Sequence, residues 1–303
     1  MTQLPSPAQG AAGRRPATAG QAPLAVQRNL ILGLLLALAA AAWILMAQHA
    51  RDGAMGGAEM VGASPTMGLR APVFLAIWVV MMAAMMFPAV APMVLAFHRI
   101  QAGRHGSGAF VPTWVFVAGY MLVWTAAGAA AYAAALAAEA VAVRTGLGPA
   151  GAARIGGAVL VAAGLYQLTP LKDRCLSKCR TPVGFIMTSW REGRLGALRM
   201  GAQHGLWCLG CCWLLFAVLF PLGLMNIAAM AALTALVFAE KTLPWGRLAA
   251  RAAAVVLVAY GGLVLAVPAA LPTYAVHAGM AMPAGGKGTT YPATVSPQAS
   301  QSR

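Results

Sequence analysis

The sequence is short of charge, and of acidic charge above all. Only 9% of its 303 residues are Asp, Glu, Lys or Arg, and only 6 of these are acidic, whereas soluble domains are roughly 25% charged. With 60% hydrophobic residues and a mean hydropathy of +0.74, a water-soluble fold would lack the polar surface needed to cover its core. The composition excludes an ordinary soluble protein and predicts an all-α fold, a polytopic transmembrane helical bundle.

Motifs of energy-coupled and catalytic proteins are also missing. The chain has no Walker phosphate-binding loop, no dinucleotide-binding glycine fingerprint and no HExxH motif. Its few carboxylates are too scattered for a proton relay. These absences exclude ATP-driven pumping by this chain alone, leave no residue to assign as catalytic or as cofactor-binding, and argue against an enzyme.

Basic residues, in contrast, are plentiful: 21 Lys and Arg give a formal net charge of +15. In a soluble protein this excess would indicate nucleic acid as a partner. In a membrane protein it is better explained by the lysines and arginines that hold loops in the cytoplasm. We therefore expect the lipid bilayer, and no nucleic acid, as a partner.

Hydrophobic runs bounded by charges or by Gly/Pro clusters predict about seven spans. They cover residues 30–48, 72–97, 111–137, 155–171, 204–222, 225–239 and 249–267. The predicted organisation is a disordered cytoplasmic tail over 1–29, a transmembrane domain over 30–267 and a disordered outer tail over 268–303. The first run could also be a cleaved signal peptide, although its length favours a retained anchor.

The distribution of basic residues predicts the orientation. With the N-terminus inside and the C-terminus outside, most Lys and Arg fall on cytoplasmic segments, as the positive-inside rule requires. The outer segments then hold only Arg51, Arg70, Arg144, Arg154, Lys287 and Arg303.

All five cysteines fall between residues 175 and 212, in two groups. Cys175 and Cys179 lie in a basic segment after the fourth predicted span. Cys208, Cys211 and Cys212 share one helical face near the start of the fifth, with His204 one turn earlier. Grouped thiolates bind soft or borderline metals such as Cu(I) and Zn(II), and the cytoplasm keeps thiols reduced. The pattern predicts a metal-binding thiol cluster at the cytoplasmic face; the alternative is that these small apolar residues merely pack.

A methionine-rich stretch in the second predicted span is the second candidate. Met81 with Met85, and Met82 with Met86, form two adjacent stripes of thioethers, which are Cu(I) ligands. Pro88 and Pro92 follow and free backbone carbonyls within the span. Methionine as a flexible packing residue is the competing explanation. Glu240 and Lys241, adjacent near the end of the sixth predicted span, suggest an interfacial ion pair.

These motifs together resemble a bacterial family, the predicted metal-binding integral membrane proteins. The resemblance covers about residues 70–265 and rests on the following segments: Met81–Pro88, Gly119-Tyr120 with Trp124, Tyr166–Lys172, Cys175 with Cys179, Cys208–Trp213, Met225-Asn226 and Glu240-Lys241. It implies a multi-pass protein of the bacterial cytoplasmic (inner) membrane that binds a metal.

Three functions remain open at this stage. The first is metal handling, with copper favoured over zinc because thiols and thioethers occur together, and with a metalloprotein as one conceivable recipient. The second is membrane thiol-redox chemistry at Cys208 and Cys211, which have the spacing of redox motifs. The third is a non-catalytic scaffold or assembly factor with a structural metal.

Overall fold

A computed structural model describes residues 24–55, 65–66, 68–105 and 109–274 of the chain. Within these ranges the structure is all-α and contains no strand. Its helices are α1 (Leu24–Met55), α2 (Ala71–His105), α3 (Phe110–Thr145), α4 (Pro149–Tyr166), α5 (Pro170–Arg180), α6 (Pro182–Ser189), α7 (Gly193–Ala217), α8 (Leu219–Leu222), α9 (Ile227–Thr242) and α10 (Gly246–Ala266), followed by the short 3₁₀ helix η3 (Pro268–Ala270).

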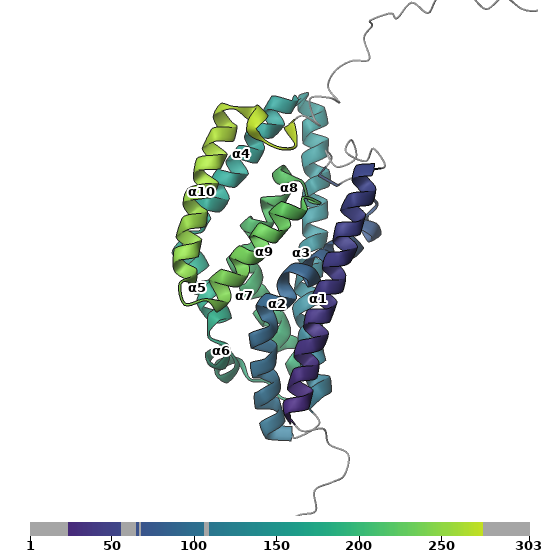
Figure 1. Cartoon of the computed structure of the whole chain (residues 1–303), viewed down its shortest axis with the longest axis vertical. Coiled ribbons are helices and arrows are strands. Elements are labelled where there is room, and N and C mark those ends of the chain that lie inside the picture. The colour runs from purple at the N-terminus through teal and green to yellow at the C-terminus, as the bar shows by residue number, and fades with distance from the viewer. Residues whose placement is uncertain (1–23, 56–64, 67, 106–108, 275–303) are drawn as a thin grey trace, which may run out of the picture.

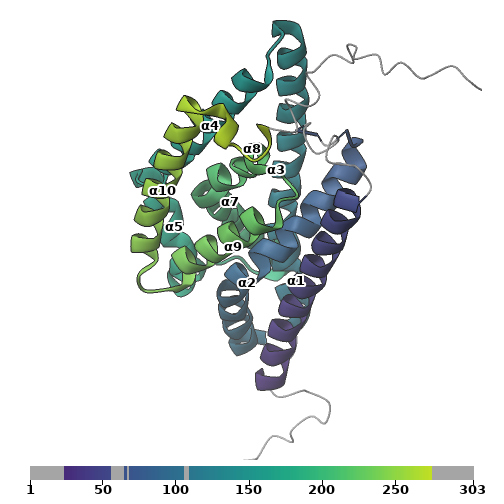
Figure 2. The ribbon, with the colours of Figure 1, turned by 45° about the horizontal axis from the view of Figure 1, so that its top comes forward.

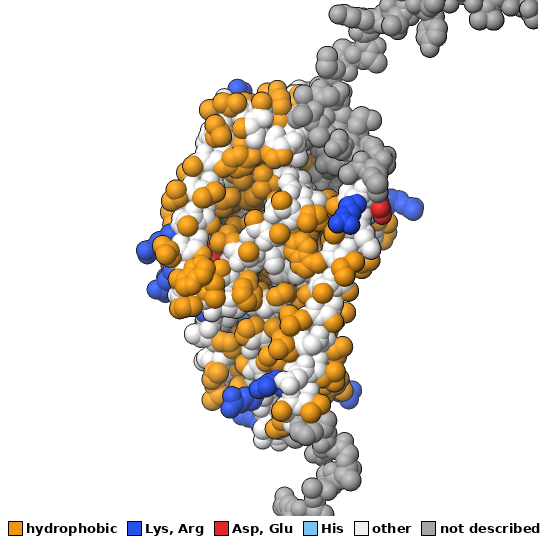
Figure 3. Space-filling view, viewed as in Figure 1, with side chains coloured by type: hydrophobic (Ala, Val, Ile, Leu, Met, Phe, Trp, Pro, Cys, Tyr) orange, Lys and Arg blue, Asp and Glu red, His pale blue; other side chains and the backbone are white. Residues whose placement is uncertain are grey.

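Six of these elements are long and apolar enough to cross a membrane. They are 24–52, 71–104, 110–145, 149–166, 193–222 and 246–266. Large apolar side chains also lie exposed on the outside, among them Val143, Val255 and Met187. Figure 3 shows a face that is mostly hydrophobic, with Lys and Arg gathered in separate groups at its edges. This surface is compatible with a multi-pass membrane protein.

The sequence placed a seventh span at 225–239. Helix α9 occupies that segment but has only 16 residues, fewer than the roughly 20 that a bilayer requires. The beginning of α1 and the end of α10 lie at opposite ends of the bundle (Figure 1).

The helices form two outer groups with α7 and α9 between them. One group pairs α4 with α10, and the other packs α1 and α3 against α2. In Figures 1 and 2 the central helices lie between these groups. Short α5 packs mainly on α7. The interior of the bundle therefore collects side chains from α2, α3, α5, α7 and α9.

Glycines allow α3 and α7 to approach closely. A Cβ at Gly201 would meet the carbonyl of Phe116, and one at Gly119 would meet that of Leu198, both far inside van der Waals distance. Small residues permit such close backbone contact between helices in membranes. The contact fixes the face of α7 that carries His204 and Cys208 against Tyr120 of α3.

Helix α2 continues through both of its prolines. Because Pro88 has no N–H, the carbonyl of Ala84 loses its partner within the helix. The indole of Trp43 in α1 donates a hydrogen bond to this carbonyl, at 3.1 Å. A side chain from a neighbouring helix thus satisfies the exposed group, as is required away from water.

Two helices begin earlier than the hydrophobic runs indicated. Helix α1 begins at Leu24, within the predicted N-terminal tail, and α7 begins at Gly193 rather than at residue 204. The added turns of α7 contain Arg194 and Arg199, whose charge hid them from a search for apolar runs. Of the tails predicted to be disordered at 1–29 and 268–303, residues 24–29 form the start of α1 and 268–270 form η3. The rest of these tails, apart from 271–274, lies outside the described residues.

Candidate functional site

The three cysteines of α7 are buried in the middle of the bundle. Cys208, Cys211 and Cys212 are each at most 1% exposed. Cys208 lies about four turns from the start of α7, because the helix begins at Gly193. Cys208 therefore lies in the middle part of α7 and not near the start of its helix, where the predicted fifth span had placed it.

A fourth thiol reaches this group from α5. Cys179 lies within side-chain hydrogen-bonding reach of Cys208 and Cys211, and the Sγ atoms of Cys211 and Cys212 are 3.5 Å apart. All five cysteines are free thiols. The contact with Cys208 raises the pKa of the Cys179 thiol well above its ordinary value. We call Cys179, Cys208, Cys211 and Cys212 the thiol cluster.

Cys175 lies beside the cluster and makes a different contact. Its Sγ packs against Gly210, at 2.9 Å from the place where a Cβ would stand. Residue 210 points to the opposite side of α7 from residue 208. Burial raises the pKa of the Cys175 thiol, which keeps it protonated.

Cys208 has two polar partners from other helices. The ammonium of Lys241 in α9 lies 2.8 Å from its Sγ, and the hydroxyl oxygen of Tyr120 in α3 lies 3.0 Å from it. All three side chains are buried. A thiolate at Cys208 would accept hydrogen bonds from both groups, and hydrogen bonds to ionised partners are the strong ones.

The predicted ion pair between Glu240 and Lys241 does not form. Consecutive helical residues point in directions about 100° apart, so Glu240 faces α5 while Lys241 faces the thiol cluster. Glu240 instead pairs with Lys172 at 2.8 Å, with both side chains at most 2% exposed. Arg180 donates to the backbone carbonyls of Glu240 and Leu243, each at 2.9 Å.

The methionine stripes of α2 lie in the same core as the thiols. Met81, Met82, Met85 and Met86 are all fully buried. The Sδ of Met86 is 4.0 Å from the Nζ of Lys241. This ammonium therefore has a thiol sulfur on one side and a thioether sulfur on another.

His204 lies next to the thiol cluster, among aromatic side chains. Its ring is 5.9 Å from that of Tyr120 and 5.3 Å from that of Phe185, between centroids. The imidazole is 2% exposed, and its Nδ1 has no hydrogen-bond partner. A buried polar atom without a partner needs an explanation, and a bound ion would supply one.

The donor set indicates which metal would fit. Among the described residues, no group of three or more Cys, His, Asp and Glu side chains is arranged to hold a metal ion. Structural zinc almost always takes a tetrahedral set of four ligands. Cu(I) is stable with fewer ligands and prefers sulfur. The thiols of the cluster and the nearby thioether of Met86 are soft donors of the kind that suits Cu(I).

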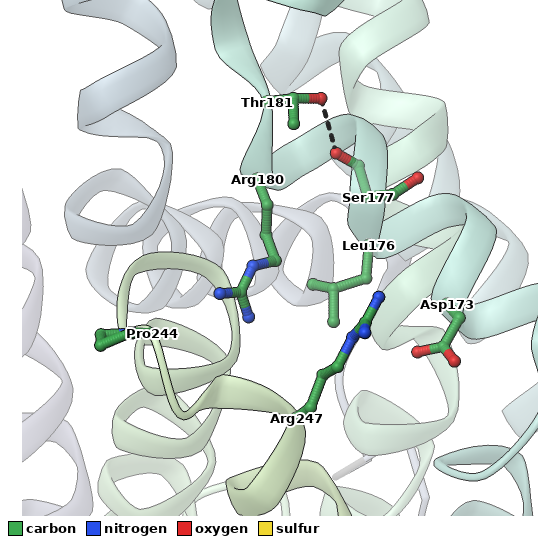
Figure 4. Close-up of a pocket in the computed structure, with 7 residues that line it drawn as sticks. All are labelled: Asp173, Leu176, Ser177, Arg180, Thr181, Pro244 and Arg247. Atoms are coloured by element: carbon green, nitrogen blue, oxygen red, sulfur yellow. Dashed lines mark hydrogen bonds between the residues drawn. The ribbon is translucent and has the colours of Figure 1, made fainter.

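A separate pocket lies between α5 and the segment around Pro244 and Arg247. It has a volume of about 300 Å³ and is lined by Asp173, Leu176, Ser177, Arg180, Thr181, Pro244 and Arg247. Figure 4 shows these side chains between α5 and the turn that precedes α10. None of the lining residues carries sulfur, so the pocket is not the place where a soft metal would bind.

The sequence did not identify Tyr120 or Lys241 as partners of the cysteines. A signal existed for Lys241, because a basic residue at the end of a nearly uncharged apolar helix requires a partner. Which partner it finds depends on the packing of α9 against α2 and α10, which a single sequence does not specify.

Comparison with protein families gives one match, to the family PpoB2, described as a copper chaperone, over residues 75–264. Comparisons with curated proteins and with solved structures give no match. The matched segment includes α3, α5, α7 and α9 completely, and almost all of α2 and α10. It contains every residue described above around the thiol cluster. Since the match covers more than half of the chain, this protein belongs to the PpoB2 copper chaperone family.

Proposed function

We propose that this protein is a multi-pass protein of the bacterial cytoplasmic membrane that binds Cu(I) at the thiol cluster and passes it to a recipient metalloprotein. Copper is the cargo in this proposal. Cys208 is the central ligand, and a second thiol from Cys179, Cys211 or Cys212 completes the smallest set. His204 and Met86 border the same place and are candidate additional ligands.

The observation that carries this proposal is the meeting of thiols from separate helices. Cys179 is carried by α5 and Cys208 by α7, and both side chains are buried. If these cysteines only filled space, nothing would require a thiol of α5 to lie against the thiols of α7. Membership of a copper chaperone family independently favours copper as the metal.

The buried methionines of α2 suggest the route along which copper moves. Met86 lies beside Lys241, and Met82, Met85 and Met81 continue along buried positions of α2 toward its start. Thioethers bind Cu(I) without needing to lose a proton. We propose that they form a path between the cluster and the outer end of the bundle.

The proposed topology has seven crossings, with α9 as a short one, the N-terminus in the cytoplasm and the C-terminus outside. The basic segment that includes α5 and α6 lies in the lower half of Figure 1, where α1 begins. The positive-inside rule places that end in the cytoplasm. Copper would then enter or leave the cluster near α5.

Anaerobic purification, loading with Cu(I) and metal analysis by mass spectrometry would test the proposal. The test variant changes Cys208, Cys211 and Cys212 to Ser, and Cys175→Ser is the matched control, since that thiol packs against Gly210. We expect copper in the wild type and in the control, and loss of copper in a triple variant that keeps its helical circular dichroism. Copper retained by the folded triple variant, or absent from the wild type, would overturn the proposal. A thiol titration that finds a reversible disulfide and no metal would favour redox chemistry instead.

A further inference from the structure

Lys241 occupies an unusual position for a buried ammonium. Its Nζ lies 2.8 Å from the Sγ of Cys208 and 4.0 Å from the Sδ of Met86. A thiol and a thioether are the two kinds of soft sulfur ligand that this bundle offers to Cu(I). A fixed positive charge therefore stands directly beside the proposed copper position.

No carboxylate neutralises this ammonium in the described part of the chain. The adjacent Glu240 is bound to Lys172 at 2.8 Å, and the hydrogen-bonding contacts of Lys241 are with sulfur atoms. A buried charge without a counter-charge is strongly unfavourable. Among the contacts of Lys241, the Cys208 thiol is the group that can provide a negative charge.

We propose that Lys241 is a specificity-determining residue that makes the cluster select a monovalent over a divalent metal ion. The inference rests on the proposed function, because it assumes that the cluster binds Cu(I). Lys241 acts through the charge of the site and is not itself a ligand.

The charge balance explains the selectivity. Two thiolates with Cu(I) carry one net negative charge, which Lys241 neutralises. The same two thiolates with Zn(II) are already neutral, so Lys241 would remain as an unbalanced positive charge in a dry interior. A third thiolate would restore neutrality with Zn(II), but it would add another negative charge to a buried cluster in which thiols already lie as close as 3.5 Å, and like charges at that distance repel.

The test compares three substitutions at one position. Lys241→Met and Lys241→Gln remove the charge, and Lys241→Arg keeps it. For each protein the dissociation constants of Cu(I) and Zn(II) are measured anaerobically, by competition with chromophoric chelators. We expect both neutral variants to lower the ratio of the zinc constant to the copper constant at least about tenfold, while Lys241→Arg keeps it within about threefold. An unchanged ratio in a folded neutral variant, or an equal fall in Lys241→Arg, would overturn the inference.

A measurement on the wild-type protein makes the test independent of how the variants fold. Cu(I) or Zn(II) is added to separate samples, and the metal that stays bound after desalting is measured by mass spectrometry. We expect stoichiometric Cu(I) and little Zn(II). Equal retention of both metals would refute the role of Lys241 while leaving copper binding intact. Absence of bound Cu(I) would instead refute the proposed function itself.

Discussion

Two lysines are buried in this bundle, and their partners differ in kind. Lys172 binds the carboxylate of Glu240 in α9 at 2.8 Å. Lys241, which follows Glu240 in α9, lies 2.8 Å from the sulfur of Cys208. A carboxylate is a permanent counter-ion at neutral pH, whereas a thiol is ionised only when its surroundings favour it. The first pair joins α5 to α9 and stabilises the fold. The second, in the function proposed above, would stabilise a thiolate at Cys208 for binding a metal.

The largest expected effect comes from removing each lysine in turn. Lys172→Met leaves the carboxylate of Glu240 buried without a partner, and should destabilise the protein by about 3–5 kcal/mol. Lys241→Met should cost less, because a thiol without its ammonium can take up a proton and become a small apolar group. Thermal unfolding in detergent would measure both. Equal losses for the two variants would contradict the distinction between the pairs.

The double variant Lys172→Met/Glu240→Met tests whether the pair of Lys172 with Glu240 serves only the stability of the fold. Replacing a whole buried ion pair by apolar residues is often nearly neutral, so most of the lost stability should return. Copper binding should also survive, since neither residue contacts the thiol cluster. Loss of copper in a stable double variant would show that the structural pair also serves the metal site.

Another prediction tests whether the contact between Cys208 and Lys241, unlike that between Lys172 and Glu240, depends on helix α3. Only the Cys208 site uses α3, through Tyr120, and the approach of α3 to α7 requires Gly201. Gly201→Ala should destabilise the protein by about 1–3 kcal/mol, because its Cβ would displace the backbone at Phe116, and it should weaken Cu(I) binding. Gly103→Ala, where a Cβ meets open space, is the matched control for thermal unfolding and for chelator competition. A stable Gly201→Ala protein with normal copper affinity would contradict this reading of the contact.

The smallest effect concerns the thioether beside Lys241. Met86→Leu conserves volume and should change stability by less than about 1.5 kcal/mol. It removes a soft donor near the cluster and should lower Cu(I) affinity about tenfold. Met82→Leu, at a position equally buried but without a contact to Lys241, serves as the control in the same titration. Equal effects at the two positions would argue that the methionines only pack.

Much of the fold followed from composition and periodicity. Apolar runs located α1, α2, α3, α7 and α10 well enough to predict an all-α bundle, because an uncharged segment of that length has few other solutions. The start of α7 was missed because Arg194 and Arg199 interrupt the hydrophobic run, although Ala197 and Met200 in this segment are buried. Hydropathy detects the lipid-facing part of a helix and not its full length.

The site was predictable only as a set of candidates. Spacing put Cys208, Cys211 and Cys212 on one face, since helical geometry is local. The approach of Cys179, the contact of Lys241 and the separation of Cys175 depend on how α5 and α9 pack against α7. The ion pair shows the same dependence on packing. The adjacent residues Glu240 and Lys241 were predicted to pair, but Glu240 pairs with Lys172 of another helix.

X-ray absorption at the copper edge of the Cu(I)-loaded protein would identify the atoms that bind the metal. We expect a first shell of sulfur, provided by Cys208 and a second thiol, that disappears in the triple Ser variant and is unchanged in Cys175→Ser. A first shell of nitrogen and oxygen without sulfur, in a protein that remains folded, would contradict this expectation.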